Sequence, residues 1–550
     1  MNIKTCRASW LSIQFFSACA IIAVTIPSWA AGDTSLEDSL RAMLKERKMT
    51  GDAIDSRKLP IPALTDPLPA LGKALFFTKA MSGGRDVACV SCHHPFFGFG
   101  DGVPLPVGVG ANDPDMIGPG RIRVNRPGTF PPFGMGDSAM PRNSPTLIGL
   151  AFWDESITWD GTVFSETGTP GMSGVDGRII APVDTPPVKG IYTMFMVPRN
   201  DQIKYEDKFD AGMPISAGHG MFPGAVNAAM RGGNFGGKGA PNTPGMTDLE
   251  VRKIIASRIG DYGGGKGAFA KNEWLALFRK GFNQPNASAE KLITPNSISI
   301  AIADYERTMT FTDTPWKAFV RGDNKAISES AKRGAQLFYR TAAEGGGNCG
   351  SCHKGDFFTD EQYWVLAVPQ IGRGKTDINN YDDGIDDWGR AHVTGHRNDK
   401  YAYRTPTLLG VEVTEPFGHS GVFNTLKDMI KHHLNAEESI RNFDYKKIPK
   451  DGGPINTKFA LEHTGYALEK LQEQRAADKK GVIRNIKLGE ESIDDIVNFL
   501  KSLTDPCLKD KACLAKWIPN RDDPDPDGLR LCAKDKTGAE FLPNSCIGKL

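Results

Sequence analysis

Two pentapeptides of the form Cys-x-x-Cys-His, at residues 89–93 and 349–353, limit most strongly what this chain can fold into. Two thiols at this spacing can each add to a vinyl group of one haem, and the histidine that follows can bind the iron. A thioredoxin-like dithiol needs only one motif within a β-α-β pattern, and a structural zinc site usually brings its cysteines together. The sequence therefore predicts two covalently bound haem c groups, attached through Cys89, Cys92, Cys349 and Cys352, with His93 and His353 as iron ligands.

Each motif lies within a longer pattern that occurs twice. Residues 71–77 precede the first motif and residues 333–339 precede the second, and both stretches carry Gly at the second position and Leu-Phe near the end. Further along the chain, residues 142–147 of the first copy match residues 404–408 of the second. A short segment follows in each copy and ends in Trp-Asp-Gly at 159–161 or in His-Ser-Gly at 419–421. We interpret the chain as a duplicated one-haem module.

Apolar residues at helical spacing predict a mostly helical structure, and no convincing run of alternating residues predicts strands. One stripe contains Ile298, Ile302, Tyr305 and Met309, with Ser297 as the expected N-cap. Residues from about 165 to 244 are rich in Gly, Pro and Met and are expected to form a long excursion from the first module. Further helices are expected at residues 248–258, 268–282, 327–340 and 425–434, and along the stripe at 493, 496, 497, 500 and 503.

The first thirty residues have the pattern of an export signal. Lys4 and Arg7 precede an apolar stretch, and Ser28 and Ala30 are the small residues that a signal peptidase requires. A retained membrane anchor is the alternative, but the stretch is shorter than the roughly 20 apolar residues that a span needs. We expect cleavage near Ala30, and therefore an exported, periplasmic protein without a membrane span.

Four more cysteines lie near the C-terminal end, around an Asp- and Pro-rich run at residues 522–527. An even number of cysteines in an exported protein favours disulfides, which here are two with three possible pairings. A metal site is the alternative, but the spacing is uneven and no His lies nearby. We expect a disulfide-containing tail that carries Cys507, Cys513, Cys532 and Cys546.

With these motifs, the chain resembles the bacterial di-haem cytochrome c peroxidase family, including its MauG-type branch. The resemblance implies a mainly α fold of two cytochrome-c-like haem domains in tandem, with long Gly/Pro-rich loops and the disulfide-containing tail. We expect a signal peptide at 1–30, an N-terminal extension at 31–66, haem domains at 67–325 and 326–505, and the tail at 506–550. The matching segments are residues 71–77, 91–95, 142–143, 159–161, 304–308 and 404–408.

The resemblance also implies roles for individual residues. The N-terminal haem, bound by His93, would react with peroxide, and the C-terminal haem, bound by His353, would supply or store electrons. Trp159 would be the tryptophan between the haems, with a core Trp that packs a haem face as the alternative. Asn143 and the backbone at 404–406 match the segments that hold a calcium ion between the family's domains, and oxygen ligands suit that cation.

The sequence departs from the family in both haem pockets. The family's distal glutamate, a proton-transfer group, aligns with Gln202, and an amide cannot carry a proton back and forth. Asp201 and Glu206 are the alternatives if the alignment is shifted. At the second haem, Gly418 occupies the position of the family's Met or Tyr ligand, so His419 becomes the nearest candidate for a sixth ligand. A five-coordinate iron is the alternative, and weaker ligand candidates are His392, His396, Met429, His432 and His433.

These features favour an exported di-haem oxidoreductase that activates hydrogen peroxide or dioxygen. MauG-type oxidation of a protein or peptide, oxygenation of an apolar substrate and plain electron transfer are the alternatives. The expected partner is a small electron-donor protein such as a cytochrome c or cupredoxin. A net charge of +1, from 66 Lys and Arg against 65 Asp and Glu, argues against a nucleic-acid-binding protein, which would need a large positive excess.

Overall fold

The computed structural model of this chain describes residues 35–57, 61–123, 140–161, 164–165, 179–180, 248–262, 269–372, 386–394, 396–449, 452–453, 455–479 and 481–543. The expected export signal, most of the excursion after residue 165, and the catalytic candidates Asp201, Gln202 and Glu206 lie outside these residues. In the described part of the chain, no helix is both long enough and apolar enough to cross a membrane.

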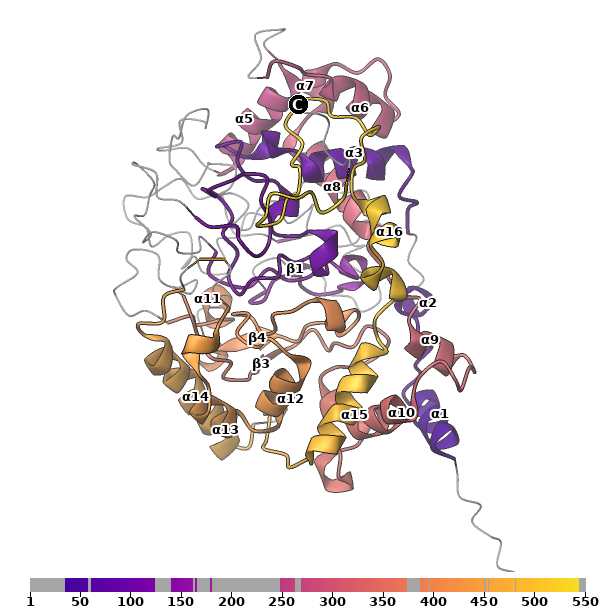
Figure 1. Cartoon of the computed structure of the whole chain (residues 1–550), viewed down its shortest axis with the longest axis vertical. Coiled ribbons are helices and arrows are strands. Elements are labelled where there is room, and N and C mark those ends of the chain that lie inside the picture. Colours follow the sequence, from indigo (N-terminus) through magenta and orange to yellow (C-terminus); the bar gives the residue numbers. More distant parts are fainter. Residues whose placement is uncertain are drawn as a thin grey trace, which may run out of the picture.

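Helices dominate the structure, as the sequence predicts, and two pairs of short antiparallel strands are the extended elements named within the described ranges (Figure 1). The strands are β1 (Phe164–Ser165), β2 (Ile179–Ile180), β3 (Tyr363–Val365) and β4 (Ala402–Arg404). The helices are α1 (Leu36–Glu46), α2 (Ala53–Arg57), α3 (Pro67–Phe77), α5 (Asp248–Gly260), α6 (Trp274–Gly281), α7 (Ala289–Leu292), α8 (Pro295–Arg307), α9 (Pro315–Val320), α10 (Glu329–Tyr339), α11 (Ala391–Thr394), α12 (Leu426–Leu434), α13 (Ala436–Arg441), α14 (Ala460–Ala476), α15 (Glu490–Lys501) and α16 (Lys511–Leu514).

Two expected helix starts are wrong. Helix α8 begins earlier than expected because Pro295 suits the first helical position and Thr294 is the N-cap, whose side chain accepts a hydrogen bond from the Ser297 amide. Ser297 completes a capping box instead, since its hydroxyl accepts a bond from the Thr294 amide at 2.9 Å. Helix α6 begins only at Trp274, so the segment expected from residue 268 is non-helical up to Glu273 where it is described.

A glycine at a helix crossing explains part of the sequence repeat. Helix α3 packs closely on α8, and a Cβ at Gly72 would lie 1.9 Å from the Ala301 carbonyl oxygen. Helix α10 packs in the same way on α15, and a Cβ at Gly334 would lie 1.9 Å from the Asp495 carbonyl oxygen. Each copy of the repeat therefore brings together the helix before its Cys-x-x-Cys-His motif and a later helix at a contact that only glycine permits.

The N-terminal extension packs against the second copy of the repeat. Helix α1 lies beside α10 (Figure 1), and Lys332 Nζ lies 2.5 Å from a Glu37 oxygen. The Asp356 carboxylate, just beyond the second motif, accepts hydrogen bonds from the amides of Thr50 and Gly51 at 2.9 and 2.8 Å and from the Thr50 hydroxyl at 2.7 Å. The extension is thus attached to the loop that carries His353.

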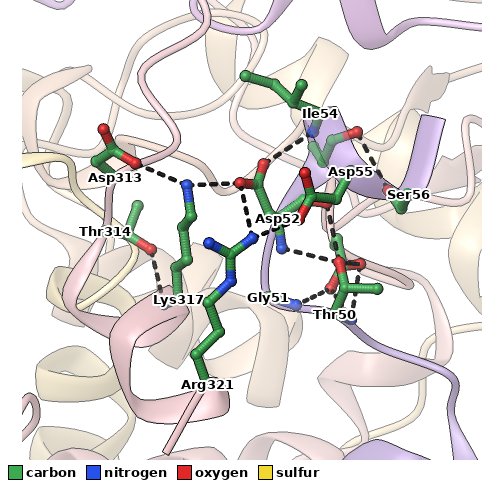
Figure 2. Close-up of polar contacts among 12 residues, drawn as sticks. Thr50, Gly51, Asp52, Ile54, Asp55, Ser56, Asp313, Thr314, Lys317 and Arg321 are labelled. Carbon is green, nitrogen blue, oxygen red and sulfur yellow. Dashed lines mark hydrogen bonds and ion pairs between the residues drawn. The ribbon is translucent and has the colours of Figure 1, made fainter. Parts of the chain in front are cut away.

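A second contact attaches the extension to α9. Figure 2 shows Asp52 facing both Lys317 and Arg321, and the Lys317 ammonium lies 2.5 Å from the Asp52 carboxylate. Asp52 is buried, so this ion pair is shielded from solvent more than a surface pair. Residues far apart in the sequence hold this segment in place.

The tail returns in the opposite direction, to the first copy of the repeat. The Asp527 carboxylate accepts hydrogen bonds from Trp274 Nε1 at 2.8 Å and from the Thr78 hydroxyl at 2.9 Å, and the Leu531 amide donates to the Phe77 carbonyl. Cys507 and Cys513 are joined by a disulfide. The second expected disulfide stays a prediction because Cys546 lies outside the described residues.

Candidate functional site

The two Cys-x-x-Cys-His motifs adopt the same local structure. Residues Cys89–Ser91 and Cys349–Ser351 each form one turn of 3-10 helix, and the amide of the motif histidine donates to the carbonyl of the first cysteine in both. None of these four cysteines forms a disulfide. Burial raises the pKa of Cys89 and of Cys349 to about 12, so both thiols are protonated at neutral pH.

Both motif histidines are oriented through the nitrogen that an iron would not use. His93 Nδ1 lies 3.0 Å from the Phe99 carbonyl oxygen, and His353 Nδ1 lies 3.0 Å from that of Phe358. A carbonyl can only accept, so Nδ1 carries the proton and Nε2 keeps its lone pair for a metal. Burial lowers the pKa of both rings, that of His353 to about 4. The neutral ligand form therefore predominates at neutral pH.

The backbone that supplies these carbonyls has an uncommon conformation in both copies. Phe99 and Phe358 have φ angles of 58° and 54°, in the left-handed region that aromatic residues seldom adopt. The carbonyls of Pro145 and Pro406, which occupy matching positions of the repeat, also raise the pKa of His93 and His353 through hydrogen bonding. The matched segments 142–147 and 404–408 thus each contact the histidine of their own motif through a proline carbonyl. The sequence analysis did not identify this contact.

These observations fit a covalently attached haem at each motif. Paired thiols that are not oxidised to a disulfide suit thioether formation, and a neutral imidazole with a hydrogen-bonded Nδ1 suits an axial ligand. Cys89, Cys92 and His93 would hold one haem, and Cys349, Cys352 and His353 the other. These six residues thus form two sets with the same local structure.

Trp159 lies at the contact between the two copies of the repeat. Its indole Nε1 donates to the Asn143 carbonyl at 2.9 Å, and its own carbonyl accepts from the Arg404 amide at 2.8 Å. The Asn143 amide donates to the His419 carbonyl at 2.8 Å, and Asn143 Nδ2 donates to the Pro416 carbonyl at 2.7 Å. The expected inter-haem tryptophan and the expected calcium residue are therefore neighbours in one network.

A buried ion-pair cluster supports this contact. Arg142 lies 2.6 Å from an Asp387 oxygen and 2.8 Å from an Asp160 oxygen, and all three side chains are buried. Burial alone would raise the pKa of Asp387, but the Arg142 guanidinium holds it at about 2. The Arg142 charge also faces the Tyr403 ring at 5.3 Å. This cluster fixes the segment that precedes Asn143.

The ring of His419 belongs to the same cluster. It stacks on the Tyr403 ring, with 3.6 Å between the ring centroids and an angle of 10° between the planes. Burial lowers the pKa of His419 to about 3. Gly418, beside it, has a φ of 89°, and a Cβ there would lie 3.0 Å from a Val368 methyl carbon. His419 therefore lies in the contact between the repeats, and its expected role as a sixth ligand stays a prediction.

The weaker ligand candidates lie in different surroundings. His432 uses both ring nitrogens, since Nε2 lies 2.9 Å from the Leu366 carbonyl and Nδ1 lies 3.1 Å from the Ser439 hydroxyl. His396 is exposed, and the side chain of His392 lies outside the description. His433 Nδ1 lies 2.8 Å from the Met429 carbonyl oxygen.

Asp101 is a buried acid beside the first motif that the sequence analysis missed. Burial raises its pKa to about 8, and its charge in turn raises the pKa of the Cys92 thiol. The only signal in the sequence is a single Asp after the Gly-rich residues 98–100. Asp101 can therefore hold a proton near the first motif at neutral pH.

Comparisons with known proteins give consistent results. Residues 67–216 match the family model for di-haem cytochrome c peroxidase. The chain is 24% identical over 444 residues to methylamine utilization protein MauG of Methylorubrum extorquens, which covers 80% of this chain and 88% of that protein. It is 30% identical over 165 residues to cytochrome c551 peroxidase of Pseudomonas aeruginosa, covering 30% and 43% respectively. The crystal structure of the diheme peroxidase BthA from Burkholderia thailandensis aligns with a TM-score of 0.45 at 19% identity, over 84% of this chain and 89% of that one.

Proposed function

We propose, on the premise that this chain is a homologue of the di-haem cytochrome c peroxidases and of MauG, that it is an exported oxidoreductase whose two haems have different tasks. The resemblance seen in the sequence is confirmed by these relatives, which are oxidoreductases, and the family implies two c-type haems. The haem that Cys89, Cys92 and His93 would hold would supply the iron that reacts with hydrogen peroxide or dioxygen, and the haem at Cys349, Cys352 and His353 would supply electrons.

The observation that carries this proposal is the position of Trp159. Its indole is hydrogen-bonded to Asn143 of the first copy, and its carbonyl is bonded to Arg404 of the second. Because each partner belongs to a segment that leads back to a motif histidine, Trp159 links the surroundings of both haems. We therefore assign to Trp159 the transfer of electrons between them.

The residues of the chain prepare each site for the haem. A haem supplies a redox-active iron with an axial position for a ligand or substrate. The carbonyls of Phe99 and Phe358 orient His93 and His353 with Nε2 available for the iron. Asp101, whose pKa burial raises to about 8, could exchange a proton near the first haem. Asp201 and Gln202 remain the proposed distal residues.

Several finer features belong to the same proposal. The chain comprises two cytochrome-c-like domains, residues 67–325 and 326–505, after cleavage of a signal peptide near Ala30, and it works in the periplasm with a small electron-donor protein. Asn143, whose Nδ2 donates to the Pro416 carbonyl, would contribute an oxygen ligand to a calcium ion. Two disulfides stabilise the tail.

A second candidate function is oxidation of a protein or peptide, as in a MauG-type enzyme. The alignment with MauG of Methylorubrum extorquens, which spans 88% of that protein, supports it. A plain electron-transfer cytochrome is the alternative without substrate chemistry.

The experiment is to mix the ferric holo-protein with hydrogen peroxide and to record the Soret band by stopped flow. We expect a fast change at one haem, followed by oxidation of the second. Trp159→Phe should retain the first phase and slow the second, whereas Trp364→Phe, a partly buried Trp on β3, should change neither. An unchanged Soret band, with low-spin signals from both irons before mixing, would contradict the peroxide-activating function and favour the electron carrier.

A further inference from the structure

A third histidine shares the orientation of the two motif histidines. His433 lies in the last turn of α12, and its Nδ1 is 2.8 Å from the Met429 carbonyl oxygen. The corresponding distances for His93 and His353 are both 3.0 Å. Because a carbonyl can only accept, Nδ1 of His433 carries the proton and Nε2 keeps its lone pair. This is the arrangement typical of a histidine that binds a metal.

His433 interacts electrostatically with the histidine of the second motif. Its charge is the second largest cause, after burial, of the lowered pKa of His353. The packing of the helices connects α12 to the second motif, because α12 contacts α15, α15 packs on α10, and α10 contacts the turn at Cys349–Ser351. Burial lowers the pKa of His433 too, so the ring is neutral and can act as a ligand.

The competing side chains are less suited to this position. His432, the neighbour of His433, uses both ring nitrogens within the protein. The His419 ring is stacked on Tyr403, beside the Arg142 and Asp387 charges that act on it. Gly418, at the position where the sequence comparison expects Met or Tyr, has no side chain. Among these described candidates, His433 therefore suits the position best. The hydrogen bond at Nδ1 leaves the lone pair of Nε2 available for a metal.

We infer that His433 Nε2 is the sixth ligand of the iron that His353 holds, so that this iron has two imidazole ligands. The inference rests on the proposed function, because it requires a haem at the second motif. An iron with two imidazoles is six-coordinate and low-spin, and it lacks the Met ligand that raises the reduction potential. The second haem is then closed to peroxide, and the reaction with peroxide is confined to the haem of His93.

The test is electron paramagnetic resonance and near-infrared magnetic circular dichroism of the ferric holo-protein, with haem content measured as the pyridine haemochrome. We expect two haems per chain and a bis-imidazole signal from one of them in the wild type. His433→Ala should replace this signal with a high-spin one, and added imidazole should restore it. His433→Met should produce a thioether–iron charge-transfer band and raise the potential of that haem. The matched controls His432→Asn and His419→Phe should keep the bis-imidazole signal.

The remaining outcomes distinguish failure of the proposed function from failure of the assignment to His433. Fewer than two haems per chain would contradict the proposed function itself. With two haems present, a bis-imidazole signal that persists in His433→Ala, that is lost in His419→Phe, or that is absent from the wild type would overturn the assignment to His433 and leave the di-haem function standing. Because His433→Met keeps a ligand at the same place, its spectrum decides the question even if the alanine variant loses haem.

Discussion

Asp387→Asn tests whether the buried ion-pair cluster holds the two copies of the repeat together. The pKa of Asp387 is about 2 instead of 3.8, which at about 1.4 kcal/mol per unit corresponds to roughly 2 kcal/mol in favour of the ionised form. Removing one partner of a buried pair typically costs about 3–5 kcal/mol. In the variant, Arg142 still has Asp160 as an ion-pair partner at 2.8 Å. We therefore expect a loss of unfolding free energy at the lower end of this range, about 3 kcal/mol.

The pH dependence of this effect follows from the direction of the shift. Because the pKa of Asp387 is depressed in the folded protein, its contribution is fully present above the unfolded value near 3.8 and is lost as the pH falls toward 2. The difference in unfolding free energy between wild type and Asp387→Asn should therefore be constant near neutral pH. It should shrink progressively below about pH 4.

The assay is urea unfolding of the holo-protein, followed by tryptophan fluorescence and by the Soret band. Asp494→Asn is the control, because Asp494 pairs with Lys427 at 2.6 Å on the surface, where a pair contributes about 0–1 kcal/mol. Equal unfolding midpoints for the two variants would refute the reasoning. So would a loss in Asp387→Asn that persists undiminished at low pH.

Three further substitutions probe the packing. Gly334→Ala should destabilise the protein by about 1–3 kcal/mol or more in urea unfolding, since the new Cβ would meet the Asp495 carbonyl at 1.9 Å. Gly465→Ala in α14, where nothing lies within 4 Å of the new Cβ, should instead stabilise it by about 0.4–1 kcal/mol, and a loss there would contradict the crossing argument. Asp356→Asn should weaken the hydrogen bonds from Thr50 by about 1–3 kcal/mol and speed amide exchange in α1, whereas unchanged exchange would mean that other contacts hold the extension.

The sequence by itself determined the local arrangement of the two Cys-x-x-Cys-His motifs and the helical class. The spacing within residues 89–93 and 349–353 is local, so the two thiols and the histidine come together in a single turn. Helical periodicity is likewise local, and α8, α10, α12 and α15 lie within a few residues of their expected positions. The ends of the helices were less predictable because capping depends on which hydroxyl reaches a free amide, as at Thr294.

Only the tertiary structure decided which distant residues meet. The extension binds Asp356 of the second copy and the tail binds Phe77 of the first, although no periodicity relates these segments. The contact of Trp159 with Asn143, and the electrostatic effect of His433 on His353, likewise depend on how helices and loops pack. The hydrophobic pattern of a sequence indicates which face of a helix is apolar, but it does not indicate against which other element that face packs. The local structure of the two motifs could therefore be predicted from their spacing, because each motif closes within one turn, and the residues that surround each motif could not.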